Sequence, residues 1–272
     1  MQLTIVRNSE NANASQLQGL VMTWACRVLA AAVGLIGAGQ AMADPRLDEK
    51  VYDPYIENHT AELEVRNGQE IGGALGGQRT TVLEAEYGLN DRLSLALVGA
   101  IAHVPGEGTK ASGLGLESVF YLGRIPGIGV DAGVYLEYKK GLGGEPDAGE
   151  AKLLLAKTAG RFQGLVNLIV ERPLNAPPGE NINAYGYAAS ATWLVAGNFR
   201  VGAQAFGDLG DEHQFLSGPQ GAYLGPQIKW EGRPSFSPVD IVVDVGWLKS
   251  IGADRLEARS QARINIEFEK HF

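Results

Sequence analysis

The chain has 272 residues, a formal net charge of −8 and a single cysteine, Cys26. The acidic balance excludes a nucleic-acid partner, because binding to phosphates needs a basic face. One cysteine excludes an internal disulfide and a thiolate metal site.

A short apolar run near the N-terminus predicts a secretory signal peptide. Residues 28–38 are apolar, Arg27 precedes them, and the small residues at 41–43 follow. This order is typical of a leader, and the run is shorter than the roughly 20 residues that cross a bilayer. We expect residues 1–43, including the cysteine, to be removed, so that Asp44 begins the mature chain.

The boundaries on either side of this leader are less sharply defined. Met1 and Met22 both remain open as the start of translation. The polar segment 44–58 is expected to form a periplasmic tail, with a plug inside a lumen as the less favoured alternative.

Alternation of apolar and polar residues recurs along the rest of the chain and predicts β-strands with two different faces. About twelve strands are expected, at 59–67, 80–87, 92–103, 113–122, 128–139, 150–159, 162–171, 183–194, 199–209, 220–230, 239–249 and 257–272. Gly225-Pro226 falls inside the tenth of these and predicts a bulge or kink there.

The closing segment 257–272 has the longest alternation, and it ends on Phe272. An alternating last strand that ends in Phe resembles the sorting signal of bacterial outer-membrane β-barrels. The resemblance implies one face toward outer-membrane lipid, one toward a polar lumen, and binding of Phe272 by the barrel-assembly machinery.

The connections between the expected strands give independent support. They alternate between long (68–79, 104–112, 140–149, 172–182, 210–219) and short (88–91, 123–127, 160–161, 196–198) up to the ninth. Barrels of the outer membrane have long external loops and short periplasmic turns. The sequence therefore predicts that residues 59–272 form an all-β, transmembrane, antiparallel up-and-down β-barrel of about twelve strands.

Three stretches add a family resemblance: Val51-Tyr-Asp-Pro-Tyr-Ile-Glu57, Leu83-Glu-Ala-Glu-Tyr-Gly-Leu-Asn-Asp-Arg-Leu93, and Gly225-Pro226. Together they resemble a broad group of poorly characterised proteobacterial barrels, described as meta-pathway phenol-degradation-like or transporter-like. The resemblance implies an outer-membrane barrel that passes small organic molecules, and it supplies no catalytic residue.

One parity of the expected strands is rich in charge and predicts the lumen lining. Its members are Glu62, Glu64, Glu84, Glu86, Glu117, Asp131, Glu137, Lys152, Arg200, Lys229, Asp240, Asp244, Arg259, Arg263 and Glu267. A net-acidic open lumen would favour cations. The alternative is a narrow lumen filled by mutually paired charges. Arg259 and Arg263 are expected to pair with Glu62 and Glu64 across the closing seam.

Passive passage of a small solute is the leading functional prediction, and a closed structural or adhesive barrel is the second. The third is a hydrolase at the rim, which would need His103 and His213 to meet near an acid or Ser217. No catalytic residue, cofactor or metal ligand is expected. The solute and the oligomeric state remain open.

Overall fold

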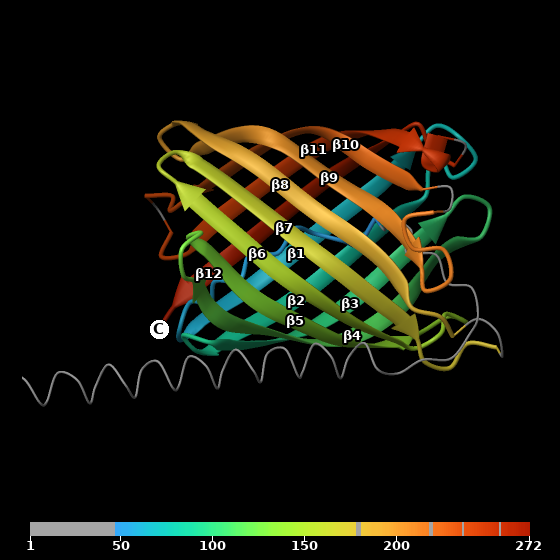
Figure 1. The fold of residues 1–272 in the computed structure, drawn as a ribbon, viewed down its shortest axis with the longest axis horizontal. Coiled ribbons are helices and arrows are strands. Elements are labelled where there is room, and N and C mark those ends of the chain that lie inside the picture. The colour runs from blue at the N-terminus through green and yellow to red at the C-terminus, as the bar shows by residue number, and fades with distance from the viewer. Residues whose placement is uncertain (1–46, 178–180, 218–219, 236, 256) are drawn as a thin grey trace, which may run out of the picture. The chain divides into compact units, whose positions relative to one another are not determined.

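The computed structural model describes residues 47–272, except 178–180, 218–219, 236 and 256. The expected signal peptide, 1–43, lies outside the described residues. In the described part the chain forms twelve strands and one short 3-10 helix (Figure 1). They are β1 (Thr60–Ile71), β2 (Arg79–Asn90), β3 (Leu93–Val104), β4 (Gly108–Ile125), β5 (Val130–Gly141), β6 (Ala148–Ala159), β7 (Phe162–Pro173), β8 (Ala184–Ala196), β9 (Phe199–Asp211), β10 (Gly221–Gly232), β11 (Asp240–Gly252), η1 (Ala253–Arg255) and β12 (Ser260–His271). Among these residues no helix is long and apolar enough to cross a membrane.

Every strand pairs antiparallel with its neighbours in the chain, and β1 pairs with β12 to close a barrel. The closing seam runs from Thr60 opposite His271 to Ile71 opposite Ser260, so it covers both strands from end to end. Closure satisfies the backbone groups that a sheet edge would leave unpaired. The predicted fold, a closed barrel of twelve antiparallel strands, is confirmed. We call the end of the barrel with Thr60 and His271 the proximal end and the opposite end the distal end.

The outer wall of the barrel is apolar. Outward-pointing side chains such as Leu63, Leu97 and Leu114 are 61%, 67% and 58% exposed. Phe162 and Trp193 form a cross-strand pair on this wall near the proximal end. A soluble protein does not expose an apolar belt of this extent, whereas a barrel in lipid requires one, with aromatic residues at the interfaces.

The first nine connections largely follow the expected alternation, with one difference. The long connection expected at 104–112 is wrong, because β4 begins at Gly108 and pairs directly with Val104 across the turn 105–107. Positive φ angles at Gly106 and Gly108 allow this tight turn. The last proximal connection, 233–239, is longer than the other proximal turns.

The Gly225-Pro226 site shows an interruption rather than an inserted residue. Leu224 pairs with Lys249 and Gln227 with Gly246, so the register of β10 against β11 is the same on both sides. The two pairs between them are absent, because proline has no N–H to donate.

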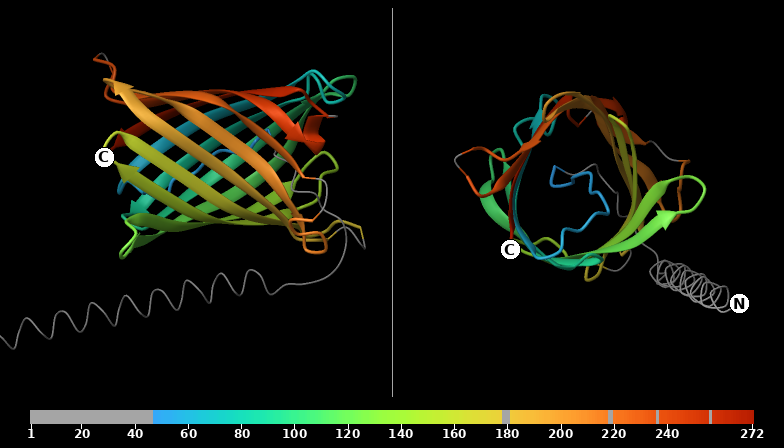
Figure 2. Two further views of the ribbon diagram at one scale, coloured as in Figure 1. Left: turned by 45° about the horizontal axis from the view of Figure 1, so that its top comes forward. Right: turned by 90° about the vertical axis from the view of Figure 1, so that its left-hand side faces the viewer.

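The segment 47–58, which we call the inner segment, lies inside the barrel and not beyond its end. It is the chain drawn inside the ring in Figure 2, right. This corresponds to the lumen plug, the alternative that the sequence favoured less. Glycines make room for its backbone: a Cβ at Gly68 would collide with Leu47, one at Gly88 with Glu57, and one at Gly133 with Pro54.

Candidate functional site: the barrel lumen

The centre of the lumen holds a network of buried charges around Lys50. Its Nζ lies 2.5 Å from Glu64 and 3.6 Å from Glu84, and Arg66 Nη1 lies 2.6 Å and 2.8 Å from the same two residues. Both carboxylate side chains are almost fully buried. Two strand glutamates are thus neutralised by one strand arginine and one lysine of the inner segment.

A second network ties the inner segment to β5 and β6. Lys152 Nζ lies 2.5 Å from Glu49 and 3.0 Å from Glu150. The same ammonium lies 4.4 Å and 4.5 Å from the ring centroids of Tyr52 and Tyr135, which contact each other at 4.7 Å. A lysine so placed combines ion pairing with cation–π attraction in a desolvated site.

Asn167 holds the backbone of the segment at its middle. The Tyr52 N–H donates to Asn167 Oδ1 at 2.7 Å, and Asn167 Nδ2 donates to the Tyr52 carbonyl at 2.8 Å. Nearer the proximal end, the Tyr55 hydroxyl donates to Asp131 at 3.1 Å. The segment is therefore held by specific side chains on several strands, as a built part of the lumen.

An apolar cluster fills the distal side of the lumen opposite this network. Ala188, Phe206, Tyr223 and Leu248 are buried there together with Ala258, and Val51 of the inner segment packs against them. The Arg263 guanidinium lies 3.9 Å from the centroid of the Phe206 ring. Side chains of the wall and of the inner segment therefore pack together in this region of the lumen.

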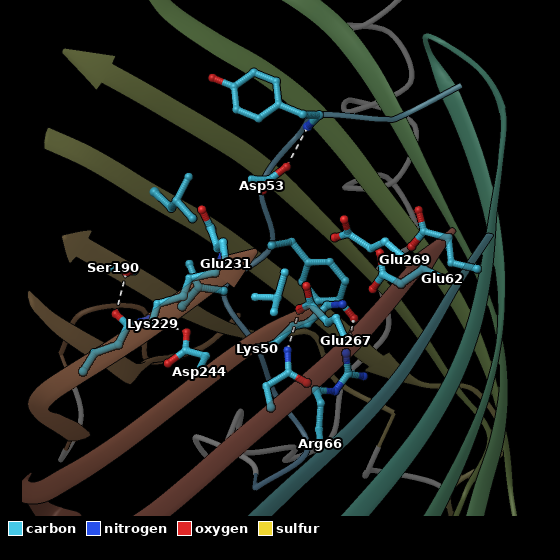
Figure 3. A pocket seen from close by; sticks show the side chains of 18 of the residues that line it. Lys50, Asp53, Glu62, Arg66, Ser190, Lys229, Glu231, Asp244, Glu267 and Glu269 are labelled. Carbon is cyan, nitrogen blue, oxygen red and sulfur yellow. Dashed lines mark hydrogen bonds and ion pairs between the residues drawn. The ribbon is translucent and has the colours of Figure 1, made fainter. Parts of the chain in front are cut away.

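On the proximal side of this cluster lies a cavity of about 550 Å³ (Figure 3). Strands β7–β12, β1 and β2 form most of its wall, Val119 of β4 adds to it, and the inner segment contributes residues from Leu47 to Glu57, Lys50 and Asp53 among them. The cavity has the size typical of a site for a small molecule. It combines polar groups such as Ser190, Gln227 and Lys229 with many carboxylates.

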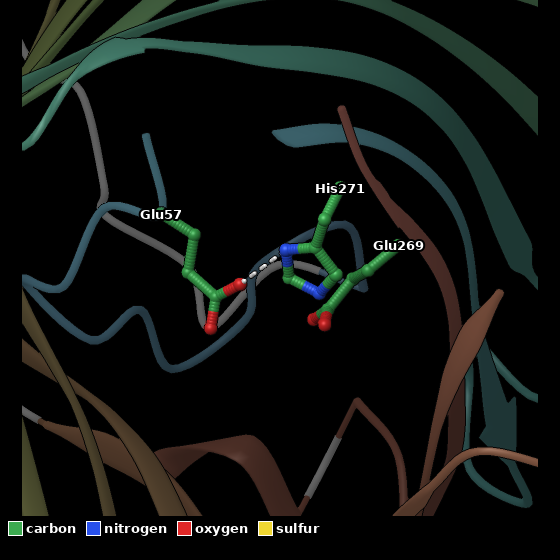
Figure 4. A group of neighbouring side chains, drawn as sticks. All are labelled: Glu57, Glu269 and His271. Carbon is green, nitrogen blue, oxygen red and sulfur yellow. Dashed lines mark ion pairs between the residues drawn. The ribbon is translucent and has the colours of Figure 1, made fainter. Parts of the chain in front are cut away.

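The cavity's carboxylates gather in two groups near the proximal end. Oxygens of Glu62, Glu267 and Glu269 all lie within 4.8 Å of one another, and so do ligand atoms of Glu57, Glu269 and His271. Figure 4 shows the second group, in which His271 Nδ1 lies 3.2 Å from Glu57. Acceptor atoms this close together suit a cation.

The structure places most of the expected lumen residues on the inner face. Those that line the cavity are Glu62, Glu86, Lys229, Asp240, Asp244, Arg263 and Glu267; Glu117, Glu137 and Lys152 line a smaller space beside the inner segment. Glu64 and Glu84 belong to the Lys50 network, Asp131 bonds to Tyr55, and Arg200 lies 3.8 Å from Glu231.

The expected pairing of Arg259 and Arg263 with Glu62 and Glu64 is wrong. Arg259 is exposed and precedes β12, which begins at Ser260. Arg263 faces the lumen but lies opposite Gly68, and it donates to Gln261 and to the Glu49 carbonyl. The register of the seam, which alternation alone does not determine, brings the glutamates of the two strands opposite each other.

Sequence reasoning missed the residues of the inner segment that complete the site. Lys50 and Tyr52 carry it together with Asn167 of β7, which bonds to the backbone of Tyr52, and none of the three stood out as a lumen residue. The signal that could have found Lys50 was the excess of acids over bases on the inner face, which required a base from elsewhere.

The two histidines of the hydrolase alternative do not meet. His103 lies one residue before the end of β3 and contacts Thr109, whereas His213 follows β9. In the closed strand order β3 and β9 are six places apart in either direction, so the two residues lie on opposite sides of the rim.

No family model and no curated protein sequence matches the chain. Among solved structures, the fold is similar to an outer membrane channel from Pseudomonas putida F1, with a TM-score of 0.53 and 12% identity over 85% of this chain and 100% of that one. It is also similar to the NanC porin, with a TM-score of 0.52 and 10% identity over 76% of this chain and 98% of that one. At these identities the likeness shows a shared barrel fold.

Proposed function

We propose that the chain is an outer-membrane channel that passes a small solute through a net-acidic lumen. The observation that carries the proposal is the polar cavity of about 550 Å³ inside a closed barrel whose outer wall is apolar. The apolar wall requires lipid, and the acidic cavity favours cations over anions. The fold shared with a Pseudomonas putida channel and the NanC porin supports the same function.

The finer family assignment is also a proposal. The stretch 51–57, which resembles the meta-pathway phenol-degradation-like barrels, supplies Tyr52 and Tyr55 to the lumen contacts. Membership in this family would mean that residues 51–57 form part of the channel lining. We also propose that the leader is removed after Ala43. N-terminal sequencing of the mature chain should then give a sequence that begins at Asp44.

Planar-bilayer recording and liposome swelling with the purified mature chain test the channel. We expect discrete conductance steps with a reversal potential that indicates a preference for cations. The matched comparison is a chain without residues 47–57, which should conduct more because the inner segment occupies part of the lumen. Absence of conductance from both chains would overturn the channel proposal.

A closed barrel without transport is the second candidate, and the inner segment and the apolar cluster favour it. In that case the full mature chain gives no conductance steps and no swelling with any solute. Conductance from the full chain rejects this candidate.

A further inference from the structure

Neighbouring strands bring carboxylates side by side across the proximal part of the lumen. Cross-strand pairing of β11, β12, β1 and β2 forms one row of Asp240, Glu269, Glu62 and Glu86, and a second row of Glu267, Glu64 and Glu84. Like charges directly opposite each other on a sheet are unfavourable. Such an arrangement needs neutralising partners.

Only part of these rows is neutralised by the protein. Lys50 and Arg66 serve Glu64 and Glu84, and Arg233 pairs with Asp240. Within the described chain, no lysine or arginine lies within ion-pair distance of the group formed by Glu62, Glu267 and Glu269, which we call the glutamate triad.

Buried polar atoms of the same cavity wall also lack partners. Asn265 donates its amide hydrogens to Glu64 and Glu267, while its buried Oδ1 has no partner among the described residues. The buried Asp244 Oδ1 and the Oγ1 of Thr192, a residue only 4% exposed, are unpartnered there too. The Asn265 and Asp244 oxygens can only accept, and the Thr192 hydroxyl can accept or donate. The Nε of Arg66 is a donor on the same wall that is likewise unpartnered among the described residues, so acceptors outnumber donors among these atoms.

Apolar side chains lie next to the triad. Val242 pairs with Glu267 on one side and Glu231 on the other, and it lines the cavity together with Leu165 and Phe206. The cavity thus offers acceptors for a cationic group beside a surface for hydrocarbon.

We propose that the cavity binds an aliphatic amine cation, with its ammonium group held by the glutamate triad and its carbon chain against Val242. The inference rests on the proposed channel and names its solute class. An ammonium supplies donors for the unpartnered acceptor oxygens and a positive charge for the triad.

Other ligand classes fit the cavity less well. The cavity is far larger than a bare ion, and Ca²⁺ prefers six to eight oxygen ligands in one place. An anion would meet Lys229, Lys50 and Arg66, but Lys229 already lies 2.6 Å from Glu231, and Lys50 and Arg66 are already paired with Glu64. An uncharged solute would leave the triad without a counter-charge.

Titration calorimetry of the purified mature chain with 1,4-diaminobutane tests the inference. We expect saturable binding of the diamine and none of 1,4-butanediol or succinate. Glu62→Gln with Glu269→Gln should weaken diamine binding by about 10- to 100-fold, the loss expected when charge-assisted hydrogen bonds are removed. Glu107→Gln, at an exposed glutamate of the β3–β4 turn, should leave it unchanged.

The remaining outcomes decide against the inference. No heat with the diamine, equal binding of butanediol, binding of Mg²⁺ alone, or undiminished binding by the double variant overturns it. Asn265→Leu is the second variant should the first fail to fold, and it should also weaken binding. Conductance without diamine binding rejects only this inference, whereas binding without conductance rejects only the channel.

Discussion

Lys152 connects the wall of the barrel to the inner segment. Its side chain is 3% exposed, and its ammonium bridges Glu150 of the wall and Glu49 of the inner segment. Removing one partner of a buried ion pair is costly because the other charge is left in a poorly solvated place. Here Glu49 can avoid that cost if the inner segment detaches from the barrel wall and its carboxylate reaches water.

Lys152→Met should therefore release the inner segment. The docking free energy should fall by about 3–5 kcal/mol, the range for a broken buried pair. A cysteine introduced as Val51→Cys should then react with a maleimide much faster than in the otherwise unchanged chain. Lys157→Met is the matched control, since that exposed lysine of the same strand bonds to the Ile128 carbonyl. Equal labelling rates in all three chains would contradict the role of Lys152.

The bonds of Asp147, in the distal β5–β6 loop, should make the order of that loop depend on pH. Hydrogen bonding from Lys140, with further bonds from the Gly141 N–H and Tyr138, holds the pKa of Asp147 below its usual value. A carboxyl whose pKa is lowered by folding adds stability above its unfolded pKa, and this stability is lost as the pH falls through the lowered value.

The loop should accordingly keep its protection from proteolysis at neutral pH and lose it only below about pH 4, where aspartates become protonated. Limited proteolysis across a pH series measures this. Asp147→Asn should be cleaved more readily at neutral pH and show little change on acidification. A wild-type loop whose cleavage does not depend on pH would show that the Asp147 bonds do not order it.

At the level of elements, one amide side chain of β7 holds the backbone of the inner segment at its middle. Asn167 satisfies both backbone groups of Tyr52 in a place with 0% exposure. Asn167→Leu should leave these groups unpaired at about 1–3 kcal/mol each. Hydrogen exchange of peptide 47–57 should be faster by roughly tenfold or more. Gln163→Leu, at another lumen-facing amide of β7, should leave the exchange rate unchanged.

The strands could be predicted from the sequence, whereas the docking of the inner segment inside the lumen could not. Alternation locates each strand to within a few residues, since lipid and lumen impose opposite demands on its two faces. The seam of β1 and β12 was expected, but its register was not, and Arg259 was misplaced for that reason. The inner segment has no alternation, so its polar sequence alone does not distinguish a solvated tail from a docked plug.

At the level of the whole molecule, the backbone and the ring of Phe272 lie in different surroundings. The Phe272 N–H donates to the His59 carbonyl at 3.1 Å and extends the closing seam by one bond. The ring itself is exposed by 75%, and Lys270 lies 5.0 Å from its centroid. The backbone of Phe272 thus extends the closing seam, while its ring is exposed at the proximal end.

The backbone hydrogen bond and the exposed ring predict different effects for Phe272→Ser in refolding and in assembly. Refolding of the purified variant in detergent should match the original chain in heat-modifiable gel migration, because the backbone bond is kept and the ring packs little. Assembly in cells should fall several-fold if the assembly machinery binds the aromatic ring, as measured by folded barrel in the outer-membrane fraction. Phe268→Ser, at an outward-facing and 41% exposed position of β12, separates recognition of the end from loss of apolar surface. Equal losses for both variants would mean that lipid contact, and not recognition of Phe272, explains the defect, since both changes remove an aromatic ring from the same strand end.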